Sequence, residues 1–308
     1  MTFMRFFKII GNKLSAFGDK IYNTFLWLIT PKENVLVLNA WVKHCGSTVR
    51  SFNFGDDINY DLVSFLSKKR VVAYNYSFVS IFHPNNYMCI GSIVDYMSNI
   101  NSIVWGSGAI GFNSKMKGIP QKVYAVRGPK TREYLLSQGV DCPEVYGDPA
   151  LLLPLIYAST QKKRYKIGLI PHIVDLKNPI LEDFKEKFGK DCVIIDFAHY
   201  VNWKEVIDTI NQCEIIASSS LHGLIISDAY EIPNVWIKFS DMIIGGGFKY
   251  YDYFLGVGRA CDEPISYINR TLNYEEILIS SKKWTPIKFD SRKLLRACPF
   301  LNLVYEDI

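Results

Sequence analysis

Short apolar segments alternate with amphipathic helical patterns along most of the chain. Apolar runs typical of buried strands lie at 34–39, 71–74, 87–90, 102–105, 122–126, 165–170, 191–197, 214–217 and 234–239. Apolar residues at helical spacing follow several of these runs, at 58–66, 130–138, 179–188 and 202–212. Strands that alternate with helices in this way predict parallel sheets joined by right-handed crossovers, and therefore an α/β fold.

A polar and basic segment, 161–164, divides this series into two parts. The segment is either a linker or a solvated charged face. As a linker, it predicts two Rossmann-like lobes with a cleft between them, over residues 31–160 and 161–285. The last segment, 286–308, carries a basic helical pattern and is expected to pack back on the first lobe.

Residues 1–30 differ in pattern from the rest of the chain. Their apolar residues recur at helical spacing and are interrupted by Arg5, Lys8, Lys13 and Lys20. The apolar runs are too short to span a bilayer, and no small-residue cleavage site follows them, so we expect neither a transmembrane helix nor a signal peptide. Two interpretations stay open: an amphipathic helix that lies on an anionic membrane surface, or a helix packed on the protein's own surface.

Composition narrows the class of ligand. The 308 residues are 49% hydrophobic and 21% charged, which suits a globular core. A net charge of +5 suits an anionic substrate or membrane surface and is too weak to indicate nucleic acid. The seven cysteines are odd in number and form no C-x-x-C pair, which favours a reducing, cytoplasmic compartment, at the inner face of the membrane if the first helix binds lipid. The histidines lack metal-ligand spacing, so we expect no metal and no cofactor.

The stretch 214–229 carries the strongest chemical signal. An apolar strand is followed by three serines and then by an apolar helical pattern, with Ser219 or Ser220 expected as the helix N-cap. His222 then falls in the first helical turn, where free amides and the helix dipole favour anions, and Gly223 permits a close approach to the backbone. A titratable imidazole beside an anion site suits a transferase of phosphorylated donors. A plain helix cap with a structural histidine is the competing interpretation.

A second junction between a strand and a helix places Arg127 just before Pro129, which suits the first helical position. Arginine is suited to bidentate contacts with carboxylate or phosphate, although a surface ion pair is equally consistent with the position. Glycines that follow predicted strands, including Gly106 and Gly108 around Ser107, permit tight turns and a close ligand. Lys249 lies among aromatic residues after a glycine-rich loop at 245–247 that could close over a ligand.

Five spaced motifs make the chain resemble the polysaccharide pyruvyl transferase family: Asn53-Phe54-Gly55-Asp56, Trp105-Gly106-Ser107-Gly108, Val126-Arg127-Gly128-Pro129, Tyr146-Gly147-Asp148-Pro149-Ala150 and Ser219-Ser220-Leu221-His222-Gly223-Leu224-Ile225. The resemblance implies a two-lobed, glycosyltransferase-B-like protein. It also implies transfer of a pyruvyl group from phosphoenolpyruvate onto a sugar of a bacterial surface polysaccharide or its lipid-linked precursor, forming a ketal. Many members carry arginine where this chain has Ser220, so other groups must neutralise the donor.

The chemistry of ketal formation requires one acid/base and cationic groups for the donor. We expect His222 to be the acid/base and Arg127 the main anion clamp. Asp56 or Asp148 could orient sugar hydroxyls, although for Asp148 a turn role is favoured because it lies next to glycine and proline. Further candidate substrate-binding residues are Ser219, Ser220, Gly223, Asn53, Asp56, Gly106, Ser107, Gly108, His172 and Lys249. The alternatives are a glycosyltransferase that uses a nucleotide sugar and a non-enzymatic scaffold on the membrane.

Overall fold

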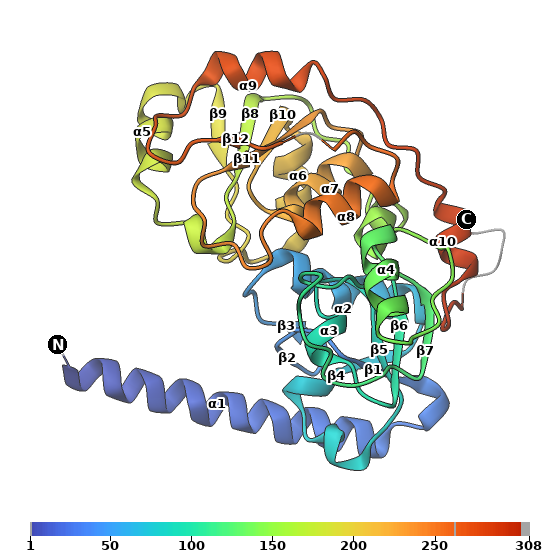
Figure 1. Cartoon of the computed structure of the whole chain (residues 1–308). Helices are drawn as coiled ribbons and strands as arrows, with labels where there is room; N and C mark the ends of the chain where they lie inside the picture. Colours follow the sequence, from blue (N-terminus) through green and yellow to red (C-terminus); the bar gives the residue numbers. More distant parts are fainter. Residues whose placement is uncertain (1, 262, 303–308) are drawn as a thin grey trace.

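The computed structural model describes residues 2–261 and 263–302, with side chains described from Lys13 onward. Two five-stranded parallel sheets and a short hairpin, β2 (His44–Cys45) with β3 (Thr48–Val49), form its framework. Figure 1 shows the first sheet in the lower part of the molecule and the second in the upper part, with helices between them. The α/β fold with parallel sheets is therefore as predicted.

The first sheet has the strand order β4-β1-β5-β6-β7. Successive residues of β1 face opposite sides, because side chains alternate along a strand. Leu36 and Leu38 enter the main core, whereas Val35 and Val37 pack with Trp27 of the first helix. The strands are β1 (Val35–Leu38), β4 (Arg70–Ala73), β5 (Asn86–Met88), β6 (Ser102–Trp105) and β7 (Lys122–Ala125).

The second sheet has the strand order β12-β11-β10-β8-β9 and is covered on both faces. Its strands are β8 (Tyr165–Ile170), β9 (Cys192–Ile194), β10 (Cys213–Ser218), β11 (Asn234–Lys238) and β12 (Ile265–Ser266). Leu181 of α5 (Pro179–Phe188) and Ile277 of α9 (Tyr274–Ser281) pack on one face. Ile210 of α6 (Trp203–Asn211) joins the core on the other.

One apolar core extends from the first sheet to the second. It contains Phe54 of α2, Leu152 of the 3-10 helix η4, Ile225 of α7 and Phe254 of α8, all with less than 2% of their surface exposed. The elements that build this layer are α2 (Phe54–Ser67), α3 (Val94–Met97), α4 (Pro129–Ser137), η4 (Pro149–Leu155), α7 (Leu221–Ala229) and α8 (Phe248–Gly256). A glycosyltransferase-B-like arrangement stays a prediction, because two packed parallel sheets do not by themselves define it.

The first helix, α1 (Thr2–Ile29), is long, and its N-terminal part extends away from the rest of the chain (Figure 1). Its C-terminal part is anchored where Asn23 Nδ2 donates to the carbonyl oxygens of His44 (2.7 Å) and Tyr76 (3.0 Å). The side chains of the expected pattern before Lys13 lie outside the described residues. None of the described helices combines the length and apolar character needed to cross a membrane.

Short 3-10 helices and one C-terminal helix complete the architecture. They are η1 (Lys32–Asn34), η2 (Tyr74–Tyr76), η3 (Val79–Phe82), η5 (Ile173–Asp175) and α10 (Ser291–Arg296). The indole of Trp105 in β6 donates to the carbonyl oxygen of Leu294 in α10 (2.9 Å), and Phe300 packs edge-on against Trp105. The C-terminal segment therefore lies against the first sheet as far as residue 302.

Candidate active site

A polar cavity of about 130 Å³ opens between the elements of the two sheets. Liquid water occupies about 30 Å³ per molecule, so the cavity has room for a small metabolite. Segments from both halves of the chain line it, because the shared core holds the strand ends of the two sheets close together. The lining residues are Trp41, Asn53, Asp56, Ser92, Ile93, Tyr96, Ile110, His172, Ser220, Leu221, His222 and Lys249.

The serines before α7 position the two histidines of the cavity. Ser220 is the N-cap residue of α7, as predicted, but its side chain makes no capping hydrogen bond. The Ser218 hydroxyl accepts the N–H of Ser220 at 3.0 Å, which fixes the turn before the helix without capping its first N–H groups. Ser219 is buried, and its hydroxyl accepts the N–H of His172 at 2.8 Å. The serine run therefore fixes the backbone beneath His172 and His222.

The imidazole of His222 lies between Gly55 and Asp148. A Cβ added to Gly55 would lie 1.9 Å from Nδ1 of His222, so only glycine leaves room for the ring at this point of α2. On the other side, Nε2 lies 3.8 Å from Oδ2 of Asp148. Neither of these two buried atoms has a hydrogen-bond partner among the described residues. Catalytic hydrogen bonds are often longer in the unliganded state, so this pair has the arrangement of an acid/base and its orienting carboxylate.

Burial and charge set the protonation of this pair. Burial lowers the pKa of His222 to about 3, and the positive charges of Lys249 and Arg127 act in the same direction. Burial raises the pKa of Asp148 to about 7, and it raises the pKa of Asp56 to about 7 as well. The unliganded cavity therefore holds a neutral imidazole and carboxyls that titrate near neutrality, as expected of a functional site.

Lys249 supplies the cation of the cavity. It lies in the first turn of α8, and only 8% of its surface is exposed. Within the described part of the chain, its ammonium group has no hydrogen bond or ion pair, and its nearest aromatic contact is the Tyr250 ring at 5.5 Å. Burial lowers the pKa of Lys249 to about 8, with the charge of Arg127 acting in the same direction. The Asp56 carboxylate of the same cavity acts on this pKa in the opposite direction, but the two groups form no ion pair. A buried ammonium that makes no ion pair is unfavourable unless an anionic ligand binds to it.

Arg127 lies behind the wall of the cavity and is wholly buried. Its Nε donates to Oδ2 of Asp252 at 3.0 Å, and Nη2 donates to the carbonyl oxygen of Ala109 at 2.9 Å. Nη1 donates to the hydroxyl of Ser92 at 2.5 Å, and Ser92 lines the cavity. Arg127 was expected to hold the donor directly, whereas this arrangement connects it to the cavity through Ser92.

Comparison with known proteins places the chain in a family. The family model described as polysaccharide pyruvyl transferase matches residues 14–241. The chain belongs to the polysaccharide pyruvyl transferase family. It is therefore a transferase, with a pyruvyltransferase role on polysaccharide. An uncharacterised protein, L143, of Acanthamoeba polyphaga mimivirus is 27% identical over 226 residues, which cover 71% of this chain and 76% of that protein. No solved structure matches the chain significantly.

The other residues predicted for the site of this pyruvyl transferase divide into two groups. Asn53, Asp56, His172, Ser220 and Lys249 line the cavity with His222. The remainder support its wall: Ser219, Gly223, Gly106, Ser107 and Gly108. A Cβ on Gly108 would lie 2.2 Å from Cζ of Arg127, and one on Gly223 would lie 2.2 Å from Oγ of Ser218. These two glycines therefore allow close packing rather than contact with a ligand in the cavity.

Three side chains near the histidine were not among the predicted site residues. Asp148 was interpreted as a turn residue, and its Oδ1 does accept the N–H of Ala150 at 3.0 Å at the start of η4. Its second oxygen, however, points to His222. Trp41 and Tyr96 also line the cavity, although each is an isolated aromatic residue in the sequence without a motif around it. Only the position of Asp148 within a family motif could have indicated its role.

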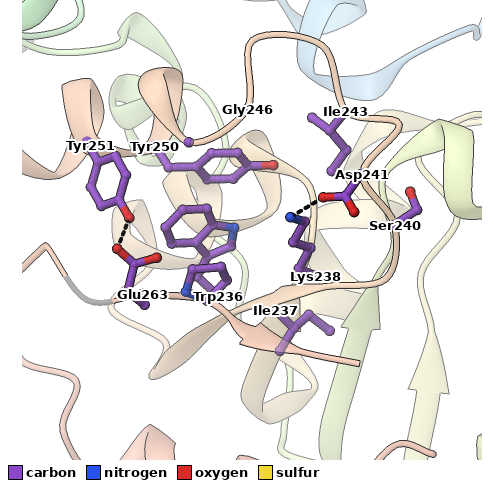
Figure 2. Close-up of a pocket in the computed structure, with 12 residues that line it drawn as sticks. Trp236, Ile237, Lys238, Ser240, Asp241, Ile243, Gly246, Tyr250, Tyr251 and Glu263 are labelled. Atoms are coloured by element: carbon purple, nitrogen blue, oxygen red, sulfur yellow. Dashed lines mark hydrogen bonds and ion pairs between the residues drawn. The ribbon is translucent and has the colours of Figure 1, made fainter. Parts of the chain in front are cut away.

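A second hollow, of about 200 Å³, lies on the other side of α8 and is lined by Trp236, Lys238, Tyr250 and Glu263 among others. Figure 2 shows the Trp236 and Tyr250 rings face to face, and their centroids are 4.3 Å apart. Its lysine is already paired, because Nζ of Lys238 lies 2.5 Å from Oδ1 of Asp241. The described lining residues include two acidic side chains, Asp241 and Glu263, and one basic side chain, Lys238. This excess of negative charge would repel a diphosphate.

Proposed function

We propose that the cavity around His222 binds phosphoenolpyruvate and transfers its pyruvyl group onto two hydroxyls of a sugar. The observation that carries this proposal is Lys249, a buried cation that forms no ion pair with any described residue and lies in the same cavity as two histidines. Phosphoenolpyruvate carries a carboxylate and a phosphate on a small frame, so it matches both the charge and the size of the cavity. No cofactor is needed in this proposal.

Binding of the donor prepares the acid. In the unliganded protein the pKa of His222 is low because the ring is buried near Lys249 and Arg127. The negative charges of the donor offset those cations and raise the pKa of His222, since an opposite charge at this range favours the charged form. Ionised Asp148, 3.8 Å from Nε2, stabilises the resulting imidazolium. The acid therefore forms when the donor is in place.

The reaction then proceeds with His222 as acid and base. His222 donates a proton to the vinyl carbon of the donor, which makes the neighbouring carbon electron-poor. One sugar hydroxyl attacks that carbon and loses its proton, and the carbon–oxygen bond to phosphate breaks, so phosphate leaves with the electron pair and takes up a proton. A second hydroxyl attacks the same carbon, loses its proton and closes the cyclic ketal. Lys249 and the amides at the start of α7 stabilise the leaving phosphate.

Arg127 contributes in this proposal through position and charge. Its buried ion pair with Asp252 joins α4 to α8, which carries Lys249. Its bond to Ser92 orients the hydroxyl that lines the cavity. Arg127 thus holds the anion-binding Lys249 and Ser92 in place. Because Ser220 stands where many family members have an arginine, Lys249 is the cation that contacts the donor.

A glycosyltransferase that uses a nucleotide sugar is the competing function. It requires a cationic site for the diphosphate and a site for the base. The hollow beside Trp236 offers aromatic walls, but its lysine is paired with Asp241. Lys249, which is buried and makes no ion pair with a described residue, lies instead in the His222 cavity, and this favours the smaller donor.

The first helix supports a location at an anionic membrane face on the cytoplasmic side, where a lipid-linked sugar of a surface polysaccharide would be the acceptor. On the face away from its anchoring contacts, α1 exposes an apolar stripe of Leu14, Phe17, Ile21, Phe25 and Leu28, each with at least half of its surface exposed. Lys13 and Lys20 lie on the same helix and would meet anionic head groups.

Mass spectrometry of acceptors incubated with the enzyme and phosphoenolpyruvate tests the function. We expect a mass gain of one pyruvate minus one water, together with release of phosphate. His222→Ala is expected to remain folded and to lose nearly all transfer. A thermal shift with UDP- or GDP-sugars but none with phosphoenolpyruvate would overturn the proposal in favour of the glycosyltransferase.

A further inference from the structure

Two aromatic side chains at the cavity around His222 are not explained by packing. Trp41 is 49% exposed, although its neighbours in the chain, Ala40 and Val42, are buried at 1% and 2%. Tyr96 is 38% exposed between buried Asp95 and Met97 in α3. Tryptophan is highly buried on average. Core packing therefore does not explain a half-exposed indole whose adjacent residues in the chain are both buried.

The two rings are tied together at this position. Nε1 of Trp41 donates to the Tyr96 hydroxyl oxygen at 3.1 Å, which fixes the indole relative to α3. The hydroxyl of Tyr96 retains its own proton for donation, since in the described part of the chain it has no acceptor. Both residues line the cavity together with Asp56. The arrangement presents a fixed aromatic surface next to hydrogen-bonding groups.

We propose that Trp41 and Tyr96 form the binding surface for the acceptor, a pyranose ring that stacks on the indole and presents its hydroxyls to the interior of the cavity. The proposal rests on the proposed function in that this sugar is the one that receives the pyruvyl group. The apolar C–H face of a pyranose matches the electron-rich face of an aromatic ring. Aromatic side chains also offer a large contact area with little loss of conformational entropy.

The polar groups beside the indole suit the rest of the sugar. Asp56 accepts a hydrogen bond from Asn53 Nδ2 at 2.7 Å through Oδ2. Its Oδ1 accepts no bond among the described residues and is free to accept a sugar hydroxyl. The Ser92 hydroxyl, which accepts from Arg127, can donate in turn. A carboxylate and a hydroxyl beside a stacking surface give a neutral sugar partners for both its hydrogen-bond donors and its acceptors.

Saturation-transfer NMR tests this surface without requiring turnover. The probes are the methyl glycosides of glucose, galactose, mannose and N-acetylglucosamine, each added to the full-length enzyme. We expect at least one of them to receive saturation on the ring protons of one face. Trp41→Ala should weaken that signal roughly tenfold, as is typical for loss of an aromatic anchor. Phe112→Ala, which removes an equally exposed ring (46%) outside the cavity lining, should leave the signal unchanged.

A thermal shift with phosphoenolpyruvate, measured on the same samples, separates this inference from the proposed function. The shift should be the same in wild type and Trp41→Ala. Trp41→Gln, a polar side chain suited to an exposed loop, is the second variant if Trp41→Ala folds poorly. Full saturation transfer to the sugar in the folded Trp41 variants, or none to any of the four glycosides in wild type, would overturn the proposal. Sugar binding at Trp41 without a phosphoenolpyruvate shift would overturn the donor assignment alone.

Discussion

The imidazole of His222 rests directly on the backbone of Gly55. A side-chain carbon at position 55 would lie 1.9 Å from Nδ1 and 2.2 Å from Cγ of the ring. Gly55 belongs to α2 in the first half of the chain, whereas His222 belongs to α7 in the second half, and both helices lie in the layer between the two sheets. The contact therefore joins the two halves of the chain at the proposed acid/base.

Gly55→Ala is expected to displace the His222 ring. Misplacement of a catalytic group by about 1 Å lowers a rate on the order of 100-fold, and overpacking costs about 1–3 kcal/mol of stability. In a His222→Ala background the clash is absent, and alanine should instead stabilise α2 by up to about 1 kcal/mol through its helix propensity. Urea unfolding of the two single variants and the double variant measures this reversal. Equal effects of Gly55→Ala in both backgrounds would contradict the contact.

Asp148→Asn is expected to lower the transfer rate while the protein keeps its stability. The asparagine Oδ1 can still accept the N–H of Ala150, but its amide cannot stabilise an imidazolium. Loss of an effective acid/base costs about 10²–10⁴-fold in rate. Asp148→Ala is the matched comparison, because it should also lose about 1 kcal/mol of stability with the cap. A wild-type rate in Asp148→Asn would exclude a role for the carboxylate.

Affinity for phosphoenolpyruvate is expected to fall as the pH rises through about 8. The pKa of Lys249 is lowered to about 8, so the ammonium is present below that pH and is lost above it. The apparent dissociation constant should then rise by roughly tenfold for each further pH unit. Lys249→Arg should remove this alkaline limb, because guanidinium stays charged, and Lys249→Met should bind weakly at every pH. Calorimetric titrations between pH 6 and about 10 provide the measurement; an unchanged limb in Lys249→Arg would assign it to another group.

Arg127→Met is expected to lower the stability of the fold more than it weakens donor binding. The substitution leaves the Asp252 carboxylate buried without its partner, which typically costs about 3–5 kcal/mol. Arg127→Met combined with Asp252→Leu should cost less than the sum of the two single changes, because no charge is then left unpaired. Chemical unfolding measures the stabilities. Unchanged stability together with a raised donor KM would show instead that Arg127 holds the donor directly.

Exposed apolar residues of α1 are expected to mediate binding to membranes. Replacing Leu14, Phe17 and Ile21 with glutamine should abolish co-sedimentation with vesicles that contain anionic lipid, since buried apolar area provides most of the binding energy. Lys13→Gln with Lys20→Gln should weaken binding by about 1 kcal/mol per charge and remove part of its salt dependence. Ile100→Gln, which changes another exposed apolar residue (76%), is the control. Binding that survives the triple change would assign the stripe to another contact.

Much of the fold follows from local patterns. The predicted strand at 165–170 coincides with β8, and the predicted helix at 179–188 coincides with α5. A strand buried on both faces has a continuous apolar run, and an amphipathic helix has apolar residues at helical spacing. A single segment displays either pattern. The same holds for His222, whose position in the first turn after a strand follows from the order of residues around it.

The partners of each site residue depend on distant segments. Arg127 and Lys249 were both expected to bind the donor, but Asp252, 125 residues further along, binds the guanidinium of Arg127, whereas Lys249 forms no ion pair with a described residue. Asp148 reaches His222 only because η4 packs beside α7. The sequence by itself therefore determined the elements and the chemical groups available. Tertiary packing decided which groups are exposed to the cavity and which neutralise one another, because charges pair through space rather than along the chain.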